Sequence, residues 1–182
     1  MSRPAEPQKK QVLLQQCLAA AIADGALDTG INSIAKKIGT SGRMLIYHFG
    51  SKQEFEQQLI GLLEIHLREK LWSFTSSSIG KASNVSESLL AMWQHLTSPE
   101  MQSLLKLSME LNQRAIQGDQ ETRHFLESES QQWIESLSHL TGSQIEALSL
   151  FHLFQGAILD FLTTGNAHRG RQTIETFAQA LD

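Results

Sequence analysis

The sequence predicts an all-α protein of about nine helices. Only three prolines occur among 182 residues, and two of them stand in the first seven positions, so the rest of the chain is almost free of helix breakers. Leu, Ala, Gln, Glu and Ser are abundant and Tyr is rare, which favours helices over strands. Apolar residues recur at intervals of three and four, the period of an amphipathic helix.

The expected helices follow from this period and from residues that start or stop a helix. Ser51 and Ser143 each precede a Glu by three residues, which is the spacing of a capping box. Pro99 suits the first position of a helix, and glycines end several of the apolar runs. We expect residues 1–7 to be disordered, a turn at 27–30, a loop over 76–85, and helices over 8–24, 32–38, 41–49, 51–74, 86–96, 99–116, 120–140, 143–164 and 171–181.

The two short helices at 32–38 and 41–49 are separated only by a turn that contains Gly39. This is the pattern of a helix-turn-helix, whose second helix is the one offered to the DNA major groove. Leu45 and Phe49, four residues apart, are expected to point inward. The outward face of the second helix is then expected to hold Gly42, Arg43, Met44, Tyr47 and His48.

Charge is distributed unevenly along the chain. The net charge of −4 would by itself argue against a nucleic-acid binder. Residues 1–52, however, hold seven Lys and Arg against three acids, whereas residues 53–182 hold eight against sixteen. A basic end on an acidic body is the asymmetry expected of a DNA-binding module joined to another domain.

Several classes of protein are disfavoured. The single cysteine, Cys17, lies in an apolar helical stripe, which indicates a buried hydrophobic residue rather than a reactive thiol. No run reaches the ~18 consecutive apolar residues of a membrane span, and the first ten residues lack the apolar core of a signal peptide. We therefore expect a cytoplasmic protein. No nucleophile–base pair, phosphate loop or metal-ligand spacing is present, so we expect neither an enzyme nor a bound cofactor or metal.

The run from Ile34 to Phe55 resembles the DNA-binding segment of TetR-type (tetracycline-repressor-like) transcriptional regulators. The shared features are Ile34-Ala35, the turn Gly39-Thr40-Ser41, Leu45, His48-Phe49 and Gly50-Ser51-Lys52. The resemblance covers roughly residues 10–60, and the remaining two thirds match only in length and helical layout. In one departure, the family often has Tyr directly after Leu, whereas here Ile46 precedes Tyr47. One position on a helix is a rotation of about 100°, so Tyr47 is expected to reach a different phosphate or a thymine methyl.

The resemblance implies a helix-turn-helix domain at 1–52 and a helical effector-binding and dimerisation domain at 53–182. Arg43 is the best candidate to recognise a guanine edge, and Lys52 to contact a phosphate. Close approach of DNA would explain Gly42 inside a helix. The implied DNA-binding residues are Thr40, Ser41, Gly42, Arg43, Met44, Tyr47, His48 and Lys52.

The rest of the chain is expected to bind a small-molecule effector and a second copy of itself. The implied pocket residues are His66, Trp93, Met109, Trp133 and Phe154, although core packing is the commoner role for any one of them. Helix 143–164 is apolar on more than one face and needs cover on two sides. The dimer interface is expected at Leu150, Phe154, Phe161, Ile174, Phe177 and Leu181.

The function implied is a ligand-responsive regulator, a repressor that binds a palindromic operator as a homodimer. Two alternatives stay open at this stage. One is a helical ligand-binding or interaction protein that has lost DNA binding, and the other is an activator in place of a repressor.

Overall fold

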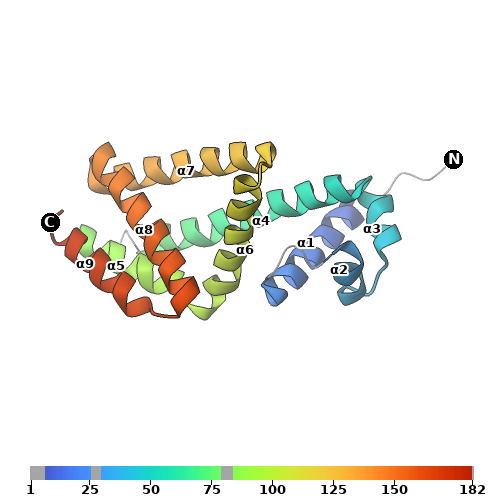
Figure 1. The fold of residues 1–182 in the computed structure, drawn as a ribbon, viewed down its shortest axis with the longest axis horizontal. Helices are drawn as coiled ribbons and strands as arrows, with labels where there is room; N and C mark the ends of the chain where they lie inside the picture. The colour runs from blue at the N-terminus through green and yellow to red at the C-terminus, as the bar shows by residue number, and fades with distance from the viewer. Residues whose placement is uncertain (1–6, 26–29, 79–83, 182) are drawn as a thin grey trace. The chain divides into compact units, whose positions relative to one another are not determined.

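The computed structural model describes the backbone of residues 7–25, 30–78 and 84–181 (Figure 1). The predicted disorder of residues 1–6, most of the predicted turn at 27–30 and residues 79–83 of the predicted loop lie outside these ranges. The described ranges fold into α-helices without a strand, which confirms the all-α prediction. The helices are α1 (Pro7–Asp24), α2 (Ile31–Lys37), α3 (Gly42–Phe49), α4 (Lys52–Ser78), α5 (Val85–Leu96), α6 (Pro99–Ile116), α7 (Gln120–Thr141), α8 (Gln144–Thr164) and α9 (Ala167–Ala178).

Two predicted boundaries are wrong by four residues. Helix α9 begins at Ala167 and not at Arg171, because the Asn166 side chain accepts hydrogen bonds from the backbone N–H groups of His168 and Arg169. An Asn in this position is a favourable N-cap. Helix α4 continues to Ser78, through serines that were expected to belong to the following loop.

The chain divides into two compact units, residues 1–71 and 72–182. The first contains α1, α2, α3 and most of α4, and α2 packs against both α1 and α3. The rings of Phe49 and Phe55 meet edge to face, with centroids 5.2 Å apart. Buried apolar residues of this unit include Cys17, Ala21, Ile34, Ala35, Leu45, Phe49, Phe55 and Leu59. The domain boundary predicted after Lys52 falls at the first residue of α4 and stays a prediction.

The second unit is built around Trp93 on α5. Its indole Nε1 donates a hydrogen bond to the carbonyl oxygen of Ala167, 3.1 Å away. The ring centroids of Phe154 and Phe161 lie 6.4 and 6.2 Å from the Trp93 ring. Gly170 lies so close that a Cβ there would overlap the indole ring. These contacts join α5, α8 and α9, while α7 packs along α8 and α6.

Helix α8 has two apolar faces. Ala147, Leu150, Phe154 and Phe161 are buried in this chain. On the other side, Ile145 is 80% exposed, Leu148 43% and Leu159 53%. By length and composition α8 alone among the described helices could cross a membrane, yet it packs against α6, α7 and α9.

The interface predicted for a dimer is therefore largely wrong. Leu150, Phe154, Phe161 and Ile174 are buried inside a single chain and cannot form the surface of a contact with another. Phe177 and Leu181 are half-buried. Helix α8 is apolar on more than one face, as expected, but its predicted interface residues lie on the face that this chain itself covers.

Candidate nucleic-acid interface

The turn between α2 and α3 is fixed by backbone hydrogen bonds and one glycine. Gly39 has a φ of 72°, in the left-handed region that favours glycine. The next N–H, that of Thr40, donates to the carbonyl oxygen of Ala35 at 2.9 Å. Ser41 then caps α3, because its Oγ accepts a hydrogen bond from the Met44 N–H. Ser41 is thus the N-cap residue of α3.

The end of α3 is equally well defined. The N–H of Gly50 donates to the carbonyl oxygen of Ile46 at 2.8 Å, and the φ of Gly50 is 96°. The Ser51 Oγ accepts a hydrogen bond from the Glu54 N–H at 3.1 Å, as the predicted capping box requires. Helix α3 is thus capped by Ser41 at its start and by Gly50 at its end, and α4 begins directly afterwards.

Three of the side chains predicted to face outward do so. Arg43 is exposed, Met44 is 40% exposed and Tyr47 is 48% exposed. Residues three and four apart share one side of a helix, so Tyr47 lies next to both Arg43 and Met44. The outer face of α3, defined by these three residues, combines a guanidinium group with apolar and aromatic surface.

The outward orientation predicted for Gly42 and His48 is wrong. Gly42 is buried against α2, where an added Cβ would overlap Oδ1 of Asn32. His48 is only 8% exposed, and neither ring nitrogen has a hydrogen-bond partner among the described residues. Both residues lie three positions from the buried Leu45. The helical spacing therefore places both on the inner face of α3, on the same side as Leu45.

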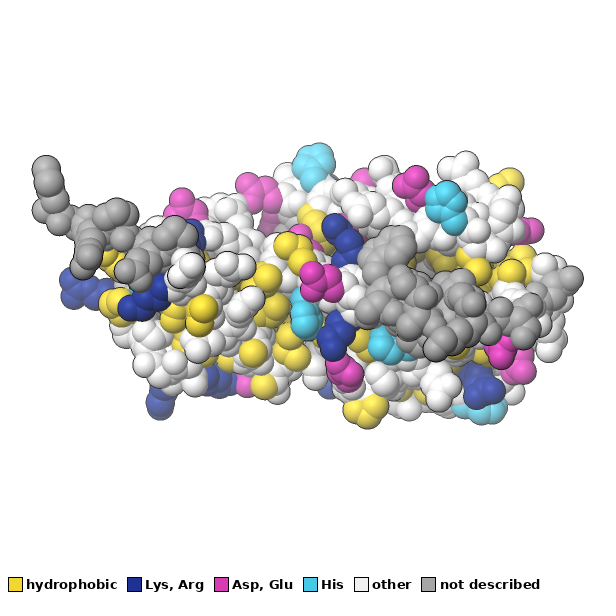
Figure 2. Space-filling view, turned by 180° about the vertical axis from the view of Figure 1, so that it is seen from behind, with side chains coloured by type: hydrophobic (Ala, Val, Ile, Leu, Met, Phe, Trp, Pro, Cys, Tyr) yellow, Lys and Arg dark blue, Asp and Glu magenta, His cyan; other side chains and the backbone are white. Residues whose placement is uncertain are grey.

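Exposed basic side chains occur on α2, on α3 and at the start of α4. Lys36, Lys37, Arg43 and Lys52 are all exposed, and several Lys and Arg side chains lie at the end of this unit shown on the left in Figure 2. Lys37 forms an ion pair with Asp24. The Lys52 Nζ lies 3.4 Å from Oε1 of Glu56. Exposed pairs of this kind contribute little stability, so a phosphate can displace the carboxylate.

The unit also contains the single cysteine. Cys17 is fully buried, as predicted, and desolvation by burial raises the pKa of its thiol to about 11. The thiol therefore stays protonated at neutral pH and takes no part in the exposed surface.

The predicted effector pocket is not assembled by the structure. Trp93 and Phe154 belong to the core of the second unit, Met109 and Trp133 are half-buried there, and His66 lies in the first unit. A groove of about 650 Å³ runs between α7 and α8, and none of the five residues lines it. Its walls are Gln131, Ile134, Glu135, Ser138, Gln144, Ile145 and Leu148. Among the described residues, no cluster of three or more His, Cys, Asp or Glu could hold a metal ion.

Solved structures with the same architecture include several regulators. A transcriptional regulator from Rhodococcus sp. Rha1 superposes with a TM-score of 0.75 and 15% identity, over 92% of this chain and 95% of that one. A protein classed in the TetR family of transcriptional regulators, from Rhodococcus sp., gives a TM-score of 0.69 and 16% identity over 96% and 98% of the two chains. The fold is that of TetR-type regulators.

A third structure extends the similarity to a protein from Pseudomonas aeruginosa PAO1 that is classed as a transcriptional regulator. It gives a TM-score of 0.66 and 18% identity, over 97% of this chain and 92% of that one. No protein-family model and no curated protein sequence matches the chain. The TetR-type resemblance found in the sequence of residues 10–60 thus extends, as a fold, over nearly the whole chain.

Proposed function

We propose that this protein is a DNA-binding transcriptional regulator, a repressor that binds a palindromic operator as a homodimer and is released by a small-molecule effector. The observation that carries this proposal is the outer face of α3, which presents Arg43, Met44 and Tyr47 on a helix capped at both ends. A TetR-type fold around that helix supports the same use. A cytoplasmic location fits a regulator of this kind, and no catalytic chemistry is invoked.

Two kinds of DNA contact are expected. The Arg43 guanidinium can donate two hydrogen bonds to the N7 and O6 acceptors of a guanine in the major groove. Phosphate contacts are expected from Thr40 and Ser41, which directly precede α3, and from Lys52, the first residue of α4. Their hydroxyl and ammonium groups can bind phosphate oxygens. Phosphate contacts release counterions, so operator affinity should fall steeply as salt concentration rises.

Gel-shift assays with the DNA upstream of the protein's own gene test the proposal. Arg43→Ala should weaken the preference for the operator over unrelated DNA, because a base contact is lost. Lys52→Ala should weaken binding to all sequences about equally, because a phosphate contact is lost. Lys106→Ala removes an exposed cation from α6 in the other unit and should leave binding unchanged. If neither α3-side variant altered binding, the proposed interface would be wrong.

The homodimer is proposed to form through the outer face of α8, defined by Ile145, Leu148 and Leu159. This face replaces the residues expected from the sequence. Exposed apolar surface on a helix of such high hydropathy costs free energy in water, and a second copy would cover it symmetrically. Two copies of α3 would then bind half-sites one DNA turn, or a multiple of a turn, apart.

Sedimentation at micromolar concentration tests the dimer. Leu148→Lys and Leu159→Lys should each shift the protein toward monomer, because a charge would be buried in the apolar contact. Ile116→Lys is the matched control: Ile116 is 82% exposed but is the last residue of a different helix, α6. A monomeric wild type, or equal loss of dimer in all three variants, would contradict the proposed face.

The effector is proposed to bind within residues 53–182 and to shift the spacing of the two α3 helices. The effector would lower operator affinity only to the extent that it binds the state with the altered α3 spacing more tightly than the state that binds the operator. Of the predicted pocket residues, His66, Met109 and Trp133 are half-buried and so accessible enough to contact it.

A helical ligand-binding or interaction protein without DNA binding is the second candidate. Two observations favour it: Glu56 and Asp24 already pair with Lys52 and Lys37, and Tyr47 is displaced by one position from the family pattern. Failure of the wild type to shift any duplex at low salt would support this candidate.

A further inference from the structure

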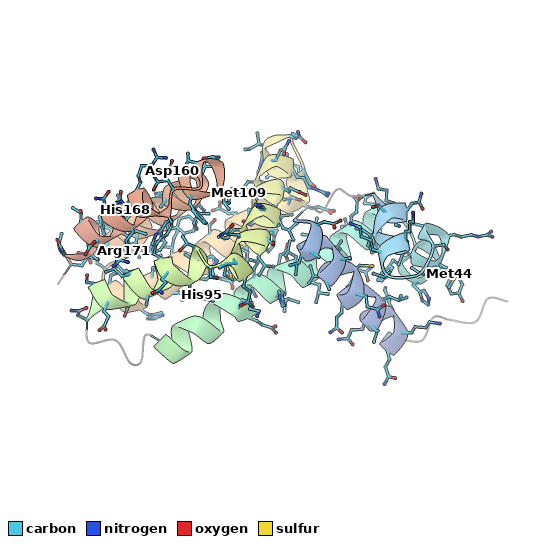
Figure 3. The ribbon with its side chains drawn as sticks, turned by 90° about the horizontal axis from the view of Figure 1, so that it is seen from below. Met44, His95, Met109, Asp160, His168 and Arg171 are labelled. Atoms are coloured by element: carbon cyan, nitrogen blue, oxygen red, sulfur yellow. The ribbon has the colours of Figure 1, made fainter. Side chains whose placement is uncertain are left out.

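The outer face of α3 contains an apolar side chain that the Arg43 and Lys52 contacts do not use. Met44 is 40% exposed and lies in the first turn of α3. Its side chain is at the surface of the helix-turn-helix (Figure 3). A single exposed methionine is common on protein surfaces, so its position on this helix matters more than its exposure.

The backbone of Met44 is held firmly. Its N–H donates to the Ser41 carbonyl oxygen at 2.9 Å and also points to the Ser41 Oγ at 3.3 Å. The residues in the N-terminal part of a recognition helix are those that contact base edges. Met44 directly follows Arg43, so the two side chains would meet base pairs close to one another.

The chemistry of the groove narrows what Met44 can contact. Base edges in the major groove present hydrogen-bond donors and acceptors, and the thymine C5 methyl is the apolar feature among them. A methionine side chain is flexible and polarisable and makes no strong hydrogen bond, so it suits such a methyl group. It has nothing to offer a phosphate.

We propose that Met44 contacts the methyl group of a thymine, so that each half-site carries a thymine close to the guanine bound by Arg43. This inference rests on the proposed function and specifies the kind of operator sequence. Met44 thereby becomes a specificity residue, and Tyr47, three positions later on the same side of α3, is its rival for the methyl group.

The experiment begins with selection of operator duplexes from a random pool by the full-length wild-type chain. Each thymine of the selected half-site is then replaced in turn by deoxyuridine, which removes only the methyl group. At one thymine per half-site, replacement by deoxyuridine should weaken binding. Affinity should fall about fourfold when one half-site is changed and about sixteenfold when both are, as expected for about one buried methyl each.

Variants assign the contact to a side chain. Met44→Ala should bind the thymine operator as weakly as wild type binds the deoxyuridine one, and should lose no further affinity on replacement. Val12→Ala shortens an apolar side chain of similar exposure on α1 and should keep the full sensitivity. Circular dichroism melts confirm that both variants are folded.

Three outcomes would overturn the contact while DNA binding stands: no thymine in the selected sequence, no sensitivity to deoxyuridine, or sensitivity that persists in Met44→Ala. If the effect of deoxyuridine on affinity disappeared only in Tyr47→Ala, the methyl contact would belong to Tyr47, and the proposed Met44 contact would be overturned. If the wild type enriched no duplex at all, the proposed DNA-binding function itself would fail, and the Met44 contact with it.

Discussion

Helices α3 and α8 each bury one face in the chain and leave another exposed, but the exposed faces differ in chemistry. The outer face of α3 mixes the cation of Arg43 with Met44 and Tyr47. The outer face of α8 is apolar along Ile145, Leu148 and Leu159. The outer face of α3 suits a nucleic acid, which is negatively charged and presents both polar and methyl groups. The second suits another apolar protein surface, because it offers no charge to a nucleic acid.

The inner faces of the two helices should respond most strongly to substitution. Leu45→Ala on α3 and Leu150→Ala on α8 should each lower the free energy of unfolding by about 2–5 kcal/mol, because a fully buried leucine leaves a cavity. Met44→Ala, on the outer face, should change it by no more than about 0.5 kcal/mol. Urea denaturation at several protein concentrations measures these values and separates folding from association. Equal effects on inner and outer faces would invalidate the division into two faces.

Gly170 tests how tightly the inner face of α8 is supported. An alanine there would place its Cβ 2.6 Å from Cη2 of Trp93, whose ring is buried and held by Phe154 and Phe161. Overpacking of this kind costs about 1–3 kcal/mol, and thermal melts should show it. Gly61→Ala is the control, since nothing lies within 4 Å of its added Cβ. The free energy of unfolding of Gly61→Ala should rise by up to about 1 kcal/mol, because alanine has a higher helix propensity than glycine. An unchanged stability of Gly170→Ala would mean that the side chains around Trp93 can move to make room for the added Cβ.

His48 tests the inner face of α3. Its buried ring nitrogens have no hydrogen-bond partner in the described part of the chain, so His48→Leu should raise the free energy of unfolding by about 1 kcal/mol. His124→Leu, at an exposed position on α7, should leave it unchanged. Loss of stability in His48→Leu would contradict this account. Unchanged operator affinity in that variant would remove His48 from the predicted DNA contacts.

A smaller effect than at Gly170 is expected at Gly42. The two nearest atoms that an alanine Cβ would meet belong to the side chain of Asn32, which is exposed and can rotate away. Gly42→Ala should therefore change the free energy of unfolding by less than about 1 kcal/mol. The cost of moving the Asn32 side chain and the gain in helix propensity have opposite signs. Chemical denaturation beside Gly170→Ala makes the comparison direct, and a large loss at Gly42 would show that α2 and α3 cannot adjust.

The sequence predicted α3 better than α8 for a physical reason. In α3 the contrast between Leu45 or Phe49 and Arg43 identifies the inner side, and the capping serine and Gly39 mark its start. The helix boundaries elsewhere follow from the same local rules, except at the Asn166 cap of α9 and at the end of α4. In α8 the apolar residues surround the helix, so local pattern alone gives no preference between Leu150 and Leu148.

Side-chain surroundings were harder to predict because they depend on contacts distant in sequence. The burial of Gly42 results from Asn32 on another helix. The role of Trp93 depends on Gly170 and Phe154, more than fifty residues away. A pocket assembled from aromatic residues on separate helices could not be distinguished from a core without these distances.

The buried thiol of Cys17 makes the protein unusually convenient for spectroscopic labelling. Thiol reagents react with the thiolate, and a pKa of about 11 in a fully buried site leaves almost none at neutral pH. A cysteine introduced at an exposed position such as Gln53 would then be the one reactive group in each chain. Spin labels attached there, in two associated copies, would report the separation of the two N-terminal units, with and without an added compound, while Cys17 stays in place.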